Sequence, residues 1–337
     1  MERKKLIAIV LSACLVLSLV VWKGTGMLKA FLNSDNEQVP TLIESPEDDQ
    51  NLRNTVLYYK DDKGFLVPVM RKIPWPEGKG IGKAAIRALV DTPANRADME
   101  SIGLTPVLPA NTEIIGMSIV DGLCRVDFTA DFLNYGNKED ELAIAKSIVY
   151  TLTEFPTVDN VQIMIEGQYP KELTYGLNVS NPLARRNINY SGNDKNKGKV
   201  IVYYQGTVTG MDNYFVPVTK DVEAGEEVTA VAVLETLIAG PTEDSGLFST
   251  IPSNLQVRNV DLIDGVAYVD FNEEIKEIKD TSIAQDIVKS IALTLREYYG
   301  SENCVEKISL MAGGKEIDFG EVVKEEPAAI PTFANEY

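Results

Sequence analysis

The chain contains an internal duplication, and this duplication restricts its possible folds more than any other feature of the sequence. Residues 54–190 and 199–323 carry the same series of motifs in the same order. Over 109–155 the second copy follows the first at a constant offset of 143 residues, without a gap. We therefore expect one kind of domain used twice, and we call the two copies repeat one and repeat two.

Strand patterns alternate with helix patterns inside each copy. In repeat one, Cys124, Val126 and Phe128 alternate with polar residues, which indicates a strand with one buried face. The pairs Asp121-Gly122 and Asp264-Gly265 stand between two such strands, where a two-residue hairpin turn requires positive φ angles. Each copy is therefore expected to contain a tight β-hairpin at this place.

Two amphipathic helices are expected in each copy. The later helix has one apolar stripe, formed by Ala145, Ile148, Leu152 and Phe155, or by Val288, Ile291, Leu295 and Tyr298. A capping box at 282–285 is expected to begin it in repeat two, and Pro93 and Pro241 are expected to end the earlier helices. The order is then β-β-α-β-β-α-β. It predicts an α+β fold of two tandem two-layer sandwich domains, each with two helices packed on one face of a small sheet.

Composition excludes several classes of chemistry. The chain of 337 residues has 45% hydrophobic residues, enough for two cores, and no histidine. Catalytic triads with histidine and histidine-ligated zinc are therefore ruled out, and three cysteines are too few and too scattered for a cysteine-only metal site. Cys124 is expected to be a small buried residue. A disulfide between Cys124 and Cys304 is possible, but no pattern requires it.

The net charge of −18 is distributed unevenly and limits the partners. Repeat one has 14 basic and 17 acidic residues, whereas repeat two has 9 and 22. Such an acidic protein repels nucleic acids and anionic lipid headgroups, so no nucleic acid is expected to bind. A protein partner with basic patches fits the acidic second repeat better.

The N-terminus carries a targeting signal. A basic segment over 2–5 precedes an unbroken apolar stretch over 6–22, which is near the lower length limit for a membrane span. Residues 1–33 are predicted to be an uncleaved signal anchor with the repeats on the extracytoplasmic side. The segment 11–14 also matches a lipobox, so lipid attachment at Cys14 is the alternative, although the apolar stretch continues beyond this cysteine. A cleaved soluble form is the third reading.

Three segments have the composition of connections. Residues 34–53 hold six acidic residues and two prolines, which predicts a solvated acidic spacer. Residues 191–198 are polar and glycine-containing, so we expect a linker that leaves some freedom between the repeats. Residues 324–337 contain Pro327 and Pro331 and are predicted to be a disordered tail.

Two aspartates could be read as catalytic groups. Asp127 and Asp270 occupy equivalent positions at the ends of strands. A single carboxylate in each of two separate domains does not form the flanking pair that glycoside hydrolysis requires. We therefore interpret both as turn or cap residues, and we expect no catalytic residues.

Other side chains admit a binding role. The strand tyrosines 58–59 and 203–204 could stack on peptidoglycan sugars, although strand tyrosines usually keep one ring face inside and the hydroxyl toward water. The pair Gly313-Gly314 lacks the spacing of a phosphate loop. The acidic runs at 47–49 and 273–274 lack the ligand pattern of a calcium site. No cofactor or metal site is expected.

At this point the sequence resembles a known family. Repeat one carries Asp121-Gly122, then 126–129, and the stretch 150–158 reads YTLTEFPTV, while repeat two keeps 237–241, LIAGP. These motifs are similar to the GerMN domain, which occurs in tandem in GerM-type sporulation and germination proteins of endospore-forming bacteria. The resemblance covers about 54–320.

The resemblance implies a non-catalytic role. GerMN domains are similar to ring-building motifs, which associate side by side between two membranes. A chain of this type is expected to help assemble an envelope-spanning channel between mother cell and forespore. Its partners would be other envelope or sporulation proteins, including ring-forming channel components, with the cytoplasmic membrane contacted through the N-terminal segment. The alternative is an envelope enzyme or sugar-binding module acting on spore cortex or peptidoglycan.

Overall fold

The structure is a computed structural model, and it describes residues 52–75, 80–192, 194, 196–208, 211–223, 227–300, 304–317 and 327–337. All of these residues belong to one compact unit, Gln50–Tyr337. The predicted anchor, Cys14 and the spacer up to residue 51 lie outside the described residues. None of the helices in the described ranges combines the length and the apolar character needed to cross a membrane.

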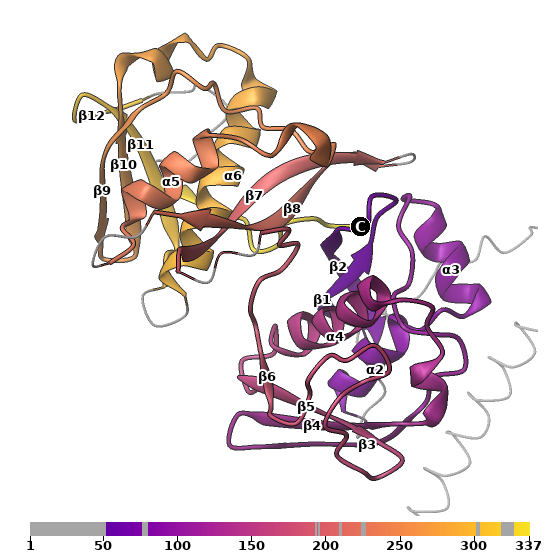
Figure 1. The fold of residues 1–337 in the computed structure, drawn as a ribbon. Coiled ribbons are helices and arrows are strands. Elements are labelled where there is room, and N and C mark those ends of the chain that lie inside the picture. Colours follow the sequence, from indigo (N-terminus) through magenta and orange to yellow (C-terminus); the bar gives the residue numbers. More distant parts are fainter. Residues whose placement is uncertain are drawn as a thin grey trace, which may run out of the picture. The chain divides into compact units, whose positions relative to one another are not determined.

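Both repeats share one succession of strands and helices, β-β-α-β-β-α-β-β, to which repeat one adds α3 and repeat two adds β12 (Figure 1). Repeat one contains β1 Leu52–Lys60, β2 Leu66–Pro74, α2 Ile81–Ala88, α3 Pro93–Glu100, β3 Ile114–Val120, β4 Leu123–Phe128, α4 Lys138–Leu152, β5 Asn160–Ile165 and β6 Leu183–Ala184. Repeat two contains β7 Gly198–Val208, β8 Met211–Val222, α5 Ala230–Ile238, β9 Val257–Ile263, β10 Val266–Phe271, α6 Thr281–Tyr299, β11 Lys307–Ala312, β12 Lys315–Glu316 and β13 Ala328–Ala329. The predicted α+β class is confirmed.

The strands of each repeat form two sheets rather than one. In repeat one, β1 and β2 make an antiparallel hairpin, and a second sheet has the order β3-β4-β5-β6. In repeat two, β7 and β8 make the hairpin, and β12-β11-β10-β9 make the second sheet, with β13 also paired to β11. The central pairs β4-β5 and β10-β11 are parallel, because a helix connects their strands.

Two helices of each repeat, α2 and α4 or α5 and α6, lie between its two sheets. In repeat one, α2 and α4 pack on each other, α4 contacts β1 and β5, and α2 contacts β1, β2 and β3, as Figure 1 shows. The predicted stripe faces inward, since Ala145, Ile148 and Leu152 are all buried. Its fourth member, Phe155, lies beyond the end of α4 and is half-buried against the same core. Cys124, Val126 and Phe128 of β4 are fully buried, as the alternation predicted.

A second, polar face of α4 binds the backbone of β1. The Thr151 hydroxyl accepts a hydrogen bond from the backbone N–H of Tyr58 at 3.1 Å, and the Ser147 hydroxyl donates to the Tyr58 carbonyl at 2.7 Å. In repeat two, Thr294 of α6 accepts from the N–H of Tyr203 at 3.1 Å. These buried hydroxyls satisfy backbone groups that the hairpin leaves unpaired toward the helix.

The local signals for turns and helix ends are partly confirmed. Asp121 and Gly122 both have positive φ, 49° and 75°, as a tight hairpin turn requires. The capping box predicted at 282–285 is wrong, because α6 begins earlier and the Asp280 side chain caps the N–H groups of Ser282 and Ile283. Pro93 does not directly end α2. It begins the additional helix α3, where the missing N–H of proline is tolerated.

Candidate functional site

The two aspartates considered for catalysis hold turns. Both carboxylate oxygens of Asp127 accept hydrogen bonds from the N–H of Gly167, at 3.0 and 3.1 Å. Asp270 accepts from the N–H of Gly314 at 2.9 Å. Each turn follows the strand parallel to the one that bears the aspartate. The pair Gly313-Gly314 is thus part of a turn held by Asp270, and the turn reading of both aspartates is supported.

We expect Asp127→Ala to lower the free energy of unfolding by about 1–2 kcal/mol, because the Gly167 N–H loses its charged acceptor. Asp127→Asn keeps one acceptor oxygen and should retain most of the stability. Urea unfolding of the two variants beside the wild type measures both effects. Equal stability of all three proteins would contradict the structural role.

The four strand tyrosines are buried. Tyr58, Tyr59, Tyr203 and Tyr204 are at most 3% exposed, so their rings offer no surface for stacking on a sugar. The expectation that the hydroxyls point to water is wrong. The Tyr58 hydroxyl donates to Glu154 at 2.8 Å, and the Tyr204 hydroxyl donates to the Thr236 and Gly240 carbonyls. Burial raises the pKa of all four phenols.

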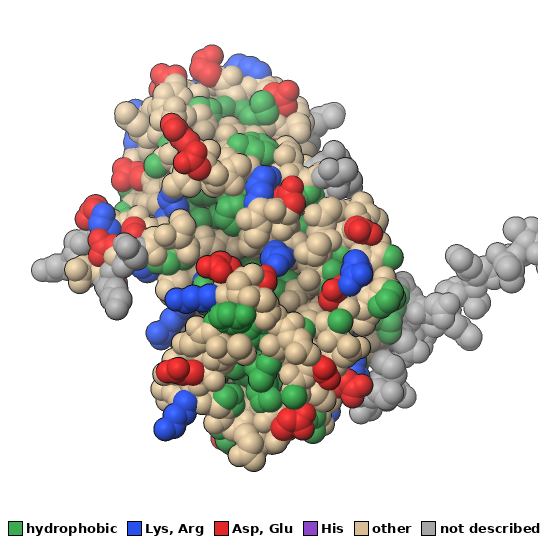
Figure 2. Space-filling model, turned by 45° about the vertical axis from the view of Figure 1, so that its right-hand side comes forward, with side chains coloured by type: hydrophobic (Ala, Val, Ile, Leu, Met, Phe, Trp, Pro, Cys, Tyr) green, Lys and Arg blue, Asp and Glu red, His purple; other side chains and the backbone are tan. Residues whose placement is uncertain are grey.

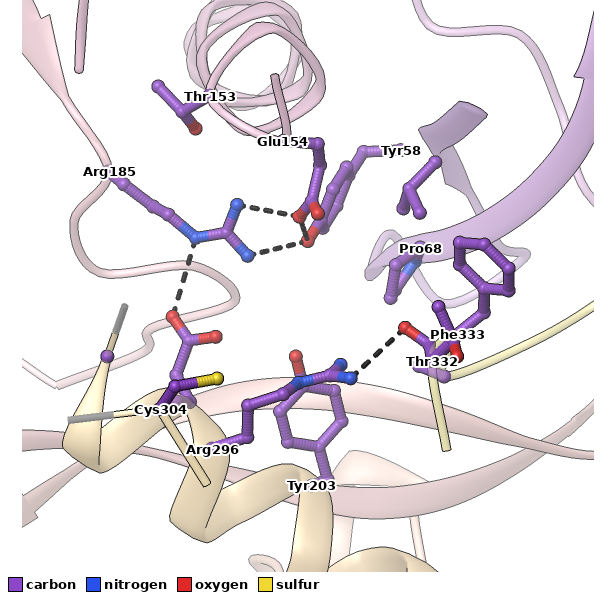
Figure 3. Close-up of a pocket in the computed structure, with 14 residues that line it drawn as sticks. Tyr58, Pro68, Thr153, Glu154, Arg185, Tyr203, Arg296, Cys304, Thr332 and Phe333 are labelled. Carbon is purple, nitrogen blue, oxygen red and sulfur yellow. Dashed lines mark hydrogen bonds and ion pairs between the residues drawn. The ribbon is translucent and has the colours of Figure 1, made fainter. Parts of the chain in front are cut away.

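A cavity of about 450 Å³ lies where the two repeats and the C-terminal segment meet (Figure 3). Its wall is formed by Val56, Tyr58, Pro68, Thr153, Glu154, Arg185, Tyr203, Arg296, Glu297, Gly300, Cys304, Thr332, Phe333 and Ala334. Two residue types occur there as equivalent pairs from the two repeats. Tyr58 matches Tyr203, and Glu154 matches Glu297. The same surface of each repeat therefore contributes to the cavity.

Arg185 is the central charge of this wall. Its guanidinium binds Glu154 at 2.7 Å and Glu297 at 3.4 Å, and it donates to the Tyr58 hydroxyl at 2.9 Å (Figure 3). It also lies over the ring of Tyr150, 4.5 Å from the centroid. Burial acts to lower the pKa of Arg185, but the neighbouring acidic groups outweigh it and hold the pKa above its ordinary value. One cation thus joins carboxylates of both repeats.

Two asparagines connect the hairpins of the repeats with matching bonds. Asn189 accepts from the Leu66 N–H at 2.8 Å and donates to the carbonyls of Leu66 and Pro217. Asn335 accepts from the Phe215 N–H at 2.7 Å and donates to the carbonyls of Phe215 and Pro68. The side chains of both asparagines therefore bridge β2 and β8, with the roles of the repeats exchanged.

The C-terminal segment belongs to repeat two, so the prediction of a disordered tail over 324–337 is wrong for 327–337. β13 pairs with β11 as β6 pairs with β5, and Asn335 acts as Asn189 does. Tyr337 continues the contact, because its N–H donates to the Met70 carbonyl and its ring lies beneath Arg71. The chain is held there by backbone and amide hydrogen bonds and by the buried Ala334.

A further bond between the repeats comes from the turn after β1. Asp61 accepts from the N–H groups of Lys63 and Phe65 at 3.0 and 2.7 Å, and from the hydroxyl of Tyr214 in β8 at 2.7 Å. Burial raises the pKa of Asp61, although these hydrogen bonds oppose the rise. These bonds connect the repeats in addition to the linker 191–198, which was expected to leave some freedom between them.

Lys146 of α4 lies beside the connecting segment and donates to the Asn187 carbonyl. Burial lowers the pKa of Lys146 to about 8 from 10.5. Between these pH values the unfolded chain holds a proton that the folded chain has released, so this lysine makes stability rise with pH.

We expect Lys146→Met to flatten this rise of stability with pH, measured by urea unfolding at pH 8 and about pH 10. An unchanged slope, or an equal effect of the exposed Lys138→Met, would contradict this.

The remaining residues considered for metal binding or reactivity do not form a site with one another. Within the described ranges, no group of three or more acidic or cysteine side chains is arranged to hold a metal ion. Cys124 is buried and Cys304 is exposed, and both are free; burial raises the pKa of Cys124 to about 11. Glu273 pairs with Lys276, whereas the acidic run at 47–49 lies outside the described residues. Figure 2 shows acidic and basic side chains mixed over the visible face.

Sequence reasoning did not find Arg185, Asn189 or Asn335. A signal was present, because Pro182 and Ala184 recur as Pro327 and Ala329, and an asparagine follows each pair. The recurrence is short and its spacing changes by one residue before the asparagine. For this reason the recurrence was not recognised as a continuation of the duplication that is evident over 109–155.

Comparison with known proteins agrees with the duplicated architecture. The profile of the Germane family, described as sporulation and spore germination, matches residues 56–170 and 201–318. The spore germination protein GerM of Bacillus subtilis is 30% identical over 294 residues, which are 83% of this chain and 77% of GerM. The solved tandem GerMN domains of the B. subtilis sporulation protein GerM are 29% identical, with a TM-score of 0.71 over 85% of this chain and 99% of theirs. The chain belongs to the Germane family of sporulation and spore germination proteins, with two tandem GerMN domains.

Proposed function

We propose that this protein is a non-catalytic assembly protein of sporulation or spore germination, anchored in the cell membrane with its repeats on the extracytoplasmic side. It binds other envelope proteins and helps to build a channel between mother cell and forespore. The observation that carries the proposal is the junction of the repeats. There Arg185, Asn189, Asn335 and Asp61 are engaged in bonds that hold one repeat to the other.

A junction of this kind suits a scaffold better than a reaction centre. Its polar side chains bind to other groups of the protein, and the aspartates equivalent between repeats hold turns. Two domains fixed to each other can present binding surfaces in a constant arrangement, which lowers the entropy lost when partners bind. The acidic second repeat adds a preference for basic partners.

Topology and association test the proposal together. In protoplasts of sporulating cells whose engulfment is incomplete, the space between the two membranes is still open. The repeats of the full chain should there be degraded by protease added outside the mother-cell membrane, and cross-linking should join them to channel proteins. Protection from external protease would contradict the location. Absence of any cross-link to envelope proteins, with the chain present at normal levels, would contradict the assembly role.

The enzymatic alternative predicts that the protein cleaves peptidoglycan, whereas the non-catalytic proposal predicts that it does not. Purified full chain in detergent, incubated with spore cortex peptidoglycan, should release no muropeptides in chromatography. Release that disappears in Asp127→Asn or Asp270→Asn would overturn the non-catalytic proposal. Unfolding curves of these variants must match the wild type for that comparison to hold.

A further inference from the structure

The strand β3 forms an outer edge of the large sheet in repeat one (Figure 1). It pairs with β4 on one side, and within the described ranges no strand or bridge pairs with its other side. Alternate residues of such an edge direct their backbone N–H and C=O groups outward, where another extended chain can pair with them. The hairpins that join the repeats are β1-β2 and β7-β8, so β3 takes no part in the junction bonds.

The residues of β3 do not protect this edge. The strand reads IIGMSIV and contains no charged residue. Ile115 is 50% exposed and Val120 is 54% exposed, and Ile119 is exposed as well. Proteins usually blunt free edges with charges, proline, bulges or coverage. The strand β3 has no charge and no proline, and its bulge at Ile115 recurs at Arg258 of β9, so the charges are what distinguish the two edges. The edge therefore has both the backbone groups and the apolar side chains that bind an extended segment.

The equivalent edge of repeat two is blunted. The strand β9 is also the last in its sheet, but it reads VRNVDLI. Arg258 stands where repeat one has Ile115, and Asp261 stands where it has Ser118. Both charged residues are exposed. One duplicated domain thus keeps an open edge in one copy and a charged edge in the other, which singles out β3.

Charges at the two ends of β3 indicate the occupant. Exposed Glu113 precedes the strand and exposed Asp121 follows it. If β3 paired antiparallel with a second copy over its full length, Glu113 would face Asp121 of that copy at both ends. Like charges directly opposite each other are destabilising, and a chain of net charge −18 adds repulsion. A strand with basic residues at its ends avoids both costs.

We propose that the β3 edge binds an extended apolar segment, flanked by basic residues, of another protein, which it adds to the sheet as a further strand. This inference rests on the proposed role in assembly and names the chemistry of one partner. The main-chain hydrogen bonds supply affinity, Ile115, Ile119 and Val120 contact alternate side chains, and Glu113 and Asp121 select basic ends.

A model peptide tests this surface. The probe has a core of alternating valine and threonine as long as β3, with two lysines at each end and a fluorophore. Full chain in detergent should bind it by fluorescence anisotropy, and hydrogen exchange should slow at those amides of Ile114–Val120 that face outward and do not pair with β4. The double variant I115R/S118D copies the residues of β9 and should weaken binding at least about tenfold, a loss of about 1.4 kcal/mol. The reverse variant Arg258→Ile/Asp261→Ser should add a second binding site.

Several outcomes would overturn the inference. These are failure of the wild type to bind the lysine-flanked peptide, equal binding by I115R/S118D, and equal binding of the same core flanked by glutamates. Protection of the outward-facing amides of Ile114–Val120 in the free chain, which do not pair with β4, would mean that another part of the chain covers the edge. If the protection of these amides increases with protein concentration, then a second copy of the chain covers the edge. If cross-links to envelope proteins persist in I115R/S118D, the assembly role stands while this surface is excluded from it.

Discussion

We expect Asn335→Ala to lower the free energy of unfolding by about 2–4 kcal/mol. The substitution removes three side-chain hydrogen bonds and leaves the buried N–H of Phe215 without an acceptor. A buried donor that loses its partner costs about 1–3 kcal/mol, and the other two lost bonds add to this. Urea unfolding followed by fluorescence measures the change.

The chain offers its own matched variants for this experiment. Asn189→Ala removes the equivalent bonds to Leu66 and Pro217 and should have a similar effect. Glu336→Gln changes the exposed neighbour of Asn335 and should leave stability unchanged within about 0.5 kcal/mol. If Asn335→Ala is as stable as Glu336→Gln, then the C-terminal segment does not fasten the repeats in solution.

The second large effect is expected for Arg185→Leu, which should cost about 2–3 kcal/mol of folding free energy. The variant leaves Glu154 and Glu297 without the cation that both of them bind. Removing one partner from a fully buried ion pair costs about 3–5 kcal/mol. The expected loss is smaller here, because the Arg185 side chain is 25% exposed and water screens part of the interaction.

Neutralising the carboxylates should reverse this loss. In the triple variant Arg185→Leu/Glu154→Gln/Glu297→Gln, the two carboxylates that lose Arg185 are neutral, so stability should recover by more than half. Arg296 in the same wall keeps its bonds to the Pro331 and Thr332 carbonyls. Arg185→Lys should lie between wild type and Arg185→Leu, because an ammonium cannot bind both carboxylates and the Tyr58 hydroxyl in the same fork geometry. A triple variant no more stable than Arg185→Leu would show that packing, rather than charge, determines the effect.

Local patterns predicted much of the domain fold. The hairpin turns at Asp121-Gly122 and Asp264-Gly265, the buried face of β4 and the stripe of α4 follow from side-chain periodicity and φ requirements that act over a few residues. Because the sequence is duplicated, each of these assignments could be made independently in both repeats. The separation of β1 and β2 into their own sheet was not predictable, because no periodicity states which strands pair.

The junction of the repeats could not be predicted from the same patterns. Asn335 binds residues 120 and 267 positions away, and the short recurrence that precedes it does not indicate which residues it binds. Arg185 had no counterpart that would mark it as a repeated feature. Glu154 and Glu297 did recur at the constant offset, and a polar residue repeated beside a helix end was the signal that could have been followed.

The hydrogen bond from Asn335 to Pro68 closes a loop of 267 residues. The entropy lost on loop closure grows with loop length, and so this contact is expected to form only after both sandwiches have folded and brought its partners near. The same reasoning orders the reverse process. The segment 327–337 should detach in partial openings that leave the two cores intact, and its amides should exchange with solvent sooner than those of β4 or β10.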